Sequence, residues 1–179
     1  MKPLTARRFA PSALLAAALL TVSPAAIAAA PVKDGKPGTL AQDIPAGEGC
    51  AFDLRVLGTG SNANIKEFLD ESGKIVRTIT AGRGYTLTYS RIVNDAPVKS
   101  ITLRPTGSVQ KETIAADRTK TVTATGGNGL ILFSTDLPKE AVPSAIQYSG
   151  RIVYTVAPDG TFTLISTSGT RLDICAALK

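Results

Sequence analysis

The side chains of this chain that could carry out chemistry are few. The sequence has no His and two Cys, and the lack of His excludes Ser-His-Asp and Cys-His hydrolases and any His metal ligand. Carboxylate pairs at glycosidase spacing are therefore the remaining general acid–base candidates. The carboxylates considered for such a pair are Asp53, Glu67, Asp70, Glu71, Glu112 and Asp136. Nothing in their spacing indicates that two of them converge, so we assign no catalytic residue, metal ligand or cofactor.

The two cysteines, Cys50 and Cys175, stand near the two ends of one region of the sequence. An exported chain reaches an oxidising compartment, in which two cysteines usually pair. They do not form a C-x-x-C motif, so a redox-active pair is not indicated. We predict a structural Cys50–Cys175 disulfide that marks a domain of residues 49–179.

Aromatic side chains are a second candidate group. Most of them fall on apolar faces of strand-like segments, where they either form a core or line a pocket inside a β-barrel. In a pocket, tyrosine hydroxyls would offer polar contacts to a small apolar or glycan ligand. The candidate ligand contacts are Tyr85, Tyr89, Phe133, Tyr148 and Tyr154. Core packing alone explains the same pattern, so both interpretations stay open.

Two further segments are candidates for contacts at the surface. Thr119, Thr121, Thr123 and Thr125 alternate along one face of a strand-like run. Such a row suits a surface or a glycan, and it is also typical of a solvated strand face with high β-propensity. Residues 136–144 contain two Pro and mixed charges, which predicts an exposed and partly rigid loop.

The N-terminal residues have the three parts of a secretory signal peptide. Arg7 and Arg8 belong to a basic start, an apolar stretch follows over residues 13–22, and an A-x-A cleavage site ends at Ala28. We expect residues 1–28 to be removed and the mature protein to be secreted without a membrane span. The removed segment carries three of the 20 basic residues and no acidic one, so the net charge falls from +6 to +3. No Lys/Arg cluster remains to favour nucleic acid as a partner.

The rest of the chain predicts an all-β domain. Residues 29–48 are rich in Pro and Gly and predict a flexible linker. From residue 50 on, short segments alternate apolar and polar side chains between turn-forming residues, and Gly126-Gly127-Asn128-Gly129 predicts a loop. We expect an antiparallel meander of about nine to eleven strands. A Cys50–Cys175 bond would bring the first and last strands together, so an up-and-down β-barrel is favoured over a two-layer sandwich.

Several short motifs give the chain a family resemblance. They are GEGCAFDLRV, IVRTITAGRG, LILFSTDLP, GRIVYTV, TFTLISTSG and DICAAL. With Cys50-Ala51-Phe52 at the first strand and Asp173-Ile174-Cys175-Ala176 at the end, the chain resembles a group of small secreted β-rich proteins of actinomycete bacteria. The resemblance implies secretion, a β-domain and a terminal disulfide, and it brings no catalytic residues with it.

These observations leave three functional hypotheses. The first is a non-enzymatic secreted β-domain that binds a small apolar or glycan ligand without a cofactor. The second is a carboxylate-dependent hydrolase of cell-wall or other glycans, and the third is an inhibitor or adhesion module that acts through its loops. A cavity lined by tyrosines favours the first, and a cleft with two carboxylates about 5–10 Å apart favours the second.

Overall fold

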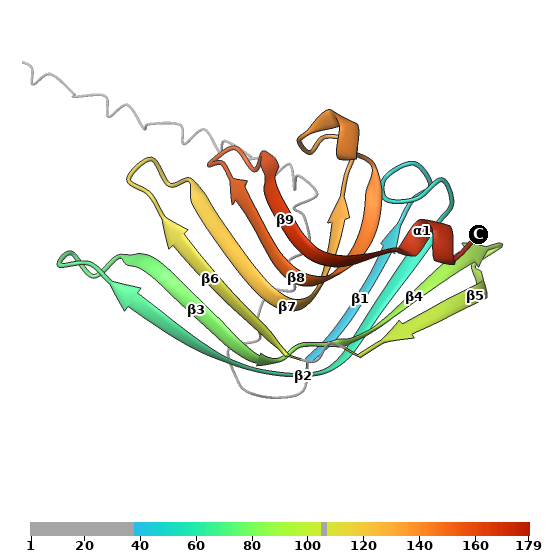
Figure 1. Cartoon of the computed structure of the whole chain (residues 1–179), viewed down its shortest axis with the longest axis horizontal. Helices are drawn as coiled ribbons and strands as arrows, with labels where there is room; N and C mark the ends of the chain where they lie inside the picture. Colours follow the sequence, from blue (N-terminus) through green and yellow to red (C-terminus); the bar gives the residue numbers. More distant parts are fainter. Residues whose placement is uncertain (1–37, 105–106) are drawn as a thin grey trace, which may run out of the picture.

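The structure, a computed structural model, describes residues 38–104 and 107–179 (Figure 1). The strands are β1 (Gly38–Ile44), β2 (Leu54–Leu69), β3 (Ile75–Arg83), β4 (Thr86–Val93), β5 (Ala96–Leu103), β6 (Ser108–Ile114), β7 (Lys120–Leu132), β8 (Ser144–Val156) and β9 (Phe162–Asp173). The helices are a 3-10 turn, η1 (Lys139–Ala141), and a short α1 (Ile174–Ala177). No helix in this described part is long and apolar enough to cross a membrane. The predicted signal peptide over residues 1–28 lies outside the described residues.

The segment predicted as a flexible linker, residues 29–48, is in part a strand. Residues 29–37 lie outside the described residues, but Gly38–Ile44 form β1 and pair along the first part of β2. Ile44 is 2% exposed and packs in the core. The linker prediction is therefore corrected for β1, because backbone pairing and one buried isoleucine outweigh a composition rich in Pro and Gly.

All nine strands belong to one antiparallel sheet, which confirms the all-β prediction. The strand order is β5-β4-β2-β3-β6-β7-β8-β9, and β1 pairs with β2 outside this order. β5 and β9 end the order without pairing to each other, so the sheet is not closed and the favoured up-and-down barrel is not supported. The disulfide does not join the two ends of the sheet, because Cys50 precedes β2 in the middle of the strand order.

The 16-residue strand β2 takes part in two regions of the sheet. Its residues 54–59 pair with β4 and with β1, whereas residues 62–69 pair with β3. We call β1, the first part of β2, β4 and β5 the small layer. We call the second part of β2, together with β3, β6, β7, β8 and β9, the wing. In Figure 1, β3 and β6 lie on one side of the drawing and β4 and β5 on the other.

A row of glycines crosses the wing from strand to strand. Gly169 pairs with Gly150, Gly150 with Gly126, Gly126 with Ser108, and Ser108 with Gly82. The φ angles of Gly169, Gly150, Gly126 and Gly82 are 94°, 156°, 92° and 151°, which L side chains rarely adopt. A Cβ at any of the four would press on a backbone carbonyl oxygen of the neighbouring strand or, for Gly126, of Gly107 just before β6. We call this row the crease, because glycines at such positions let a sheet bend sharply.

Two hydrophobic clusters stabilise this arrangement. The first lies between the small layer, the C-terminal end of β7 and the N-terminal end of β8, and it includes Leu54, Tyr89, Ile131 and Ile174. Ile174 belongs to α1, where Cys175 bonds to Cys50 with the Cα atoms 5.4 Å apart. The predicted disulfide is thus confirmed, and it fastens the C-terminal helix to the first cluster.

The second cluster gives the wing two different faces, because side chains alternate along each strand. The face that carries the buried residues Val122, Ala124, Ile152 and Tyr154 is the inner face. The Tyr154 ring stacks on Phe162 of β9 at 4.7 Å between centroids. The alternate residues of the same strands, mostly polar, form the outer face.

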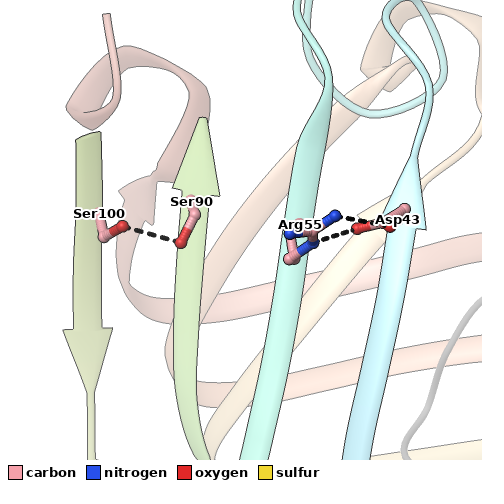
Figure 2. A network of polar contacts seen from close by, with 4 residues as sticks. All are labelled: Asp43, Arg55, Ser90 and Ser100. Atoms are coloured by element: carbon pink, nitrogen blue, oxygen red, sulfur yellow. Dashed lines mark hydrogen bonds and ion pairs between the residues drawn. The ribbon is translucent and has the colours of Figure 1, made fainter. Parts of the chain in front are cut away.

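Polar pairs join neighbouring strands of the small layer (Figure 2). Arg55 of β2 donates two hydrogen bonds to Asp43 of β1, at 2.6 and 3.0 Å. The hydroxyls of Ser90 and Ser100 lie 2.8 Å apart between β4 and β5. The hydrogen bond from Arg55 lowers the pKa of the Asp43 carboxyl. This ion pair is exposed, so it adds little to stability and mainly fixes the register of β1 on β2.

Candidate functional site

A cavity of about 130 Å³ lies where the small layer meets the wing. Leu40 of β1 and Val56 of β2 line it from the small layer, and Ala124 and Ile152 line it from the inner face of the wing. None of its lining residues, all within the described ranges, carries a charge. The cavity is thus a mainly apolar space at the bend between two parts of one sheet.

Three of the five aromatic residues predicted as ligand contacts line this cavity: Tyr85, Tyr89 and Tyr154. Tyr89 is 2% exposed, and its hydroxyl donates to Oε1 of Gln147 at 3.3 Å. Gly129 of β7 makes this position available, because a Cβ there would collide with the Tyr89 hydroxyl. Burial raises the pKa of both Tyr89 and Tyr154 above the ordinary tyrosine value. Both hydroxyls are protonated at neutral pH, as ordinary tyrosines are, and each keeps a donor.

The other two predicted contacts, Phe133 and Tyr148, lie elsewhere. Phe133 packs in the first hydrophobic cluster and Tyr148 in the second, each 4% exposed. Neither side chain lines the cavity. For these two residues, core packing is the role that the structure gives them.

Asn128 of β7 contributes the unpaired polar group of the lining. Its Oδ1 accepts a hydrogen bond from Ser108 Oγ at 2.8 Å, whereas its Nδ2 is buried and has no partner among the described residues. A buried donor without a partner costs about 1–3 kcal/mol. Sequence reasoning missed Asn128 because its glycine-rich surroundings predict a loop. In the structure these residues continue β7 and pair with β8.

The carboxylates considered for hydrolysis do not meet at the cavity. Glu67 and Glu112 share the inner face of the wing, one on each side of Thr78. Glu112 is occupied by an ion pair with Lys120 at 3.4 Å. Neither Glu67 nor Glu112 lines the cavity. The cavity holds no carboxylate, so it gives no support to the hydrolase hypothesis.

The remaining carboxylates with defined contacts serve turns. Asp136 is 4% exposed and accepts a hydrogen bond from the Phe133 amide at 2.8 Å. Asp53 accepts from a backbone amide of the segment before β2, and Asp70 accepts from the amide and hydroxyl of Ser72. The described part of the chain holds no group of three or more His, Cys, Asp or Glu side chains that could bind a metal.

The two surface segments that the sequence singled out are both ordered by backbone pairing. Thr121, Thr123 and Thr125 lie on the outer face of β7. The loop over residues 136–144 is fastened at Leu137, whose amide donates to Phe162 O at 3.0 Å and whose carbonyl accepts from Leu164 N at 2.8 Å. Only the middle of this loop, around η1, presents charged side chains to solvent.

The disulfide is typical of an oxidising environment such as the cell exterior. Comparison of the chain with protein-family models, curated proteins and solved structures finds no match. The function is therefore inferred from the geometry of the site itself.

Proposed function

We propose that the protein is a secreted, non-enzymatic β-domain that binds one small, neutral, mainly apolar ring compound in the cavity beside the crease. The observation that carries the proposal is the uncharged cavity of about 130 Å³, with its tyrosine hydroxyls and the unpaired Asn128 amide. Apolar walls with a few placed polar groups are typical of small-molecule sites.

The volume sets the size of the ligand. An apolar cavity of roughly 150 Å³ holds a benzene-sized molecule, so this cavity takes one ring, and most of a long acyl chain or an oligosaccharide would lie outside it. Asn128 lines the cavity, and a rotation of its side chain would turn the unpaired Nδ2 toward an acceptor on the ligand, such as a hydroxyl or carbonyl oxygen. A ring with one oxygen substituent therefore matches the site better than a bare hydrocarbon.

The test is thermal unfolding of the purified protein with benzyl alcohol, p-cresol and toluene. Dodecanoate and cellobiose serve as compounds of the wrong size. A ring compound at 100 times its Kd should stabilise the fold by roughly 2.7 kcal/mol, with the oxygenated rings binding more tightly than toluene. The proposal would be overturned if none of the three ring compounds shifted the melting temperature, or if only dodecanoate or cellobiose did.

Two variants locate binding in the cavity. Ala124→Leu fills the space from β7, where Ala124 is 2% exposed, and should weaken benzyl alcohol binding at least about tenfold. Ala81→Leu is the matched control, because Ala81 lies on the outer face of β3 and does not line the cavity. Asn128→Leu should remove the preference for benzyl alcohol over toluene. Equal weakening by the two alanine substitutions would place binding outside the cavity.

A further inference from the structure

The outer face of the wing carries a regular array of side chains that the cavity does not use. The strand register sets these side chains in rows, because residues that pair across strands share a face. One row joins Phe68, Arg77, Thr113, Thr121, Thr155 and Thr163. The next row begins with Lys66, Ile79, Lys111 and Thr123. Threonines therefore alternate along β7, as the sequence shows, and also pair across the four strands β6, β7, β8 and β9.

Charge is divided between the two faces of the wing. Among the described residues, the outward positions of its strands include basic side chains and no acidic one. These basic residues are Lys66, Arg77, Arg83, Lys111 and Arg151. Glu67 of β2 and Glu112 of β6 lie on the inner face instead. The ion pairs found in the described residues involve none of the five outer bases.

Two of these cations are held in place by an aromatic ring. The Arg77 guanidinium lies 3.7 Å from the centroid of the Phe68 ring, and Lys66 Nζ lies 5.2 Å from it. Cation–π contacts of this kind restrict the side chains without neutralising their charge. Within the described residues, Arg77 Nε also has no hydrogen-bond partner. The outer face therefore presents prearranged positive charge.

The hydroxyls add a second kind of donor and acceptor. Neighbouring strands lie about 4.8 Å apart and alternate residues of one strand about 6.8 Å apart, so the threonines form a regular two-dimensional grid. Thr121, Thr125 and Ser168 are exposed, as are Lys66, Lys111 and Arg151. Lys66 and Lys111 lie two strands apart in one row, on either side of Ile79.

We propose that this outer face binds an extended acidic polysaccharide, with the basic side chains on its carboxylates and the threonine grid on its hydroxyls. Charge complementarity selects an anionic partner, and the regular hydroxyl grid suits a sugar chain. A nucleic acid is disfavoured because Phe68, the aromatic residue of these rows, is covered by its own cations and cannot stack on bases. A membrane surface is disfavoured because the large apolar side chains of this face, such as Ile79 between Lys66 and Lys111, stand singly among bases and threonines, whereas insertion requires a continuous apolar face.

The experiment measures binding of polygalacturonate, a uronate polymer, to the full mature chain, with dextran as the neutral polymer. Polygalacturonate should bind and dextran should not, and binding should weaken as salt rises. The triple variant Lys66→Gln, Lys111→Gln, Arg151→Gln should lower the affinity at least about tenfold. The control triple variant Lys99→Gln, Arg104→Gln, Arg171→Gln removes the same charge away from the outer face and should change it less than about twofold. Equal losses in the two triples would overturn the proposal.

Two further arms separate the partners. Double-stranded DNA and vesicles of anionic phospholipid are measured under the same conditions, and binding of either one more tightly than polygalacturonate would overturn the choice of a sugar chain. Thr121→Val with Thr155→Val removes two hydroxyls of one row and keeps the charge. This variant should weaken polygalacturonate binding a few-fold without changing its salt dependence, and unchanged affinity would show that the threonine grid takes no part.

Discussion

At the scale of single residues, Asp136 shows how a buried charge is held in this fold. Its carboxylate accepts a hydrogen bond from the Phe133 amide, with Lys139 and Glu48 as the charged groups nearby. Burial raises the pKa of Asp136 above the ordinary aspartate value, although the Phe133 amide and Lys139 act in the opposite direction. The folded state therefore binds a proton at this site more readily than the unfolded state.

Asp136→Asn tests this assignment through the pH dependence of stability. Because the folded-state pKa is raised, the stability contributed by Asp136 is present below the ordinary aspartate pKa and is lost as pH rises through the raised value. The free energy of unfolding of the variant, measured with urea, should therefore rise relative to that of the parent protein as pH rises across that window. Asp159→Asn is the control, since backbone and side-chain hydrogen bonds from Thr161 lower the pKa of Asp159. The free energy of unfolding of that variant should fall relative to the parent protein as pH rises, and the same trend in both variants would contradict the assignment.

Sequence alone identifies part of the cavity residue by residue. Tyr85, Tyr89 and Tyr154 are visible as aromatic side chains on apolar strand faces, and they line the cavity. Phe133 and Tyr148 give the same sequence signal and lie in the core, because alternation places a side chain on a face without saying what covers that face. Asn128 gives no signal, because only its pairing with β8 shows that its glycine-rich surroundings are strand.

At the scale of elements, three hairpins share one turn. The β2–β3, β6–β7 and β8–β9 connections each close with the same pair of backbone hydrogen bonds, such as Ala115 N to Thr119 O at 2.9 Å. Each turn has five residues, beginning at Asp70, Ala115 or Ala157. The fourth residue of each turn, Gly73, Arg118 or Gly160, has a φ angle of 79°, 71° or 89°, respectively. This geometry suits glycine, so Arg118 is the exception. Such turns can be predicted from sequence where Gly marks them. The strand β1 cannot, because its pairing partners in β2 are ten or more residues away.

Arg118→Gly should stabilise the protein. A left-handed conformation costs an L-residue roughly 1–2 kcal/mol, and the extra freedom of glycine in the unfolded chain offsets about half of that. We expect a net gain of about 0.5–1 kcal/mol in chemical unfolding. Ala116→Gly in the same turn is the control and should destabilise, since Ala116 has no positive φ. A loss of stability in Arg118→Gly would contradict the strain.

At the scale of the whole molecule, the C-terminal helix and the Cys50–Cys175 disulfide stabilise the open sheet. Ile174 of α1 and Leu178, which follows the helix, are both 0% exposed in the first hydrophobic cluster, and the disulfide joins α1 to Cys50. The sequence predicts this bond from the compartment and the number of cysteines. It could not predict an open sheet, because closure depends on which strands pair over long range. The same bond is compatible with a barrel and with the arrangement seen here.

Replacing both cysteines, Cys50→Ser with Cys175→Ser, should lower the free energy of unfolding by about 2–5 kcal/mol. The bond spans 125 residues, so its loss frees a long loop in the unfolded chain. The loss should be matched by reduction of the parent protein with dithiothreitol, which should not affect the double variant. A double variant as stable as the oxidised parent would show that packing of α1 alone is sufficient.

The crease also restricts how the length of this chain can change during evolution. Gly82, Gly126, Gly150 and Gly169 stand at one level across the wing. One residue inserted within a strand would move its glycine off that level and turn every later side chain of the strand to the opposite face. Insertions and deletions should therefore fall at the hairpin tips, in the 136–144 loop, or at β-bulges away from the crease such as the one at Val153 and Tyr154. Descendants of this fold would differ in the reach of their loops and keep the glycines aligned.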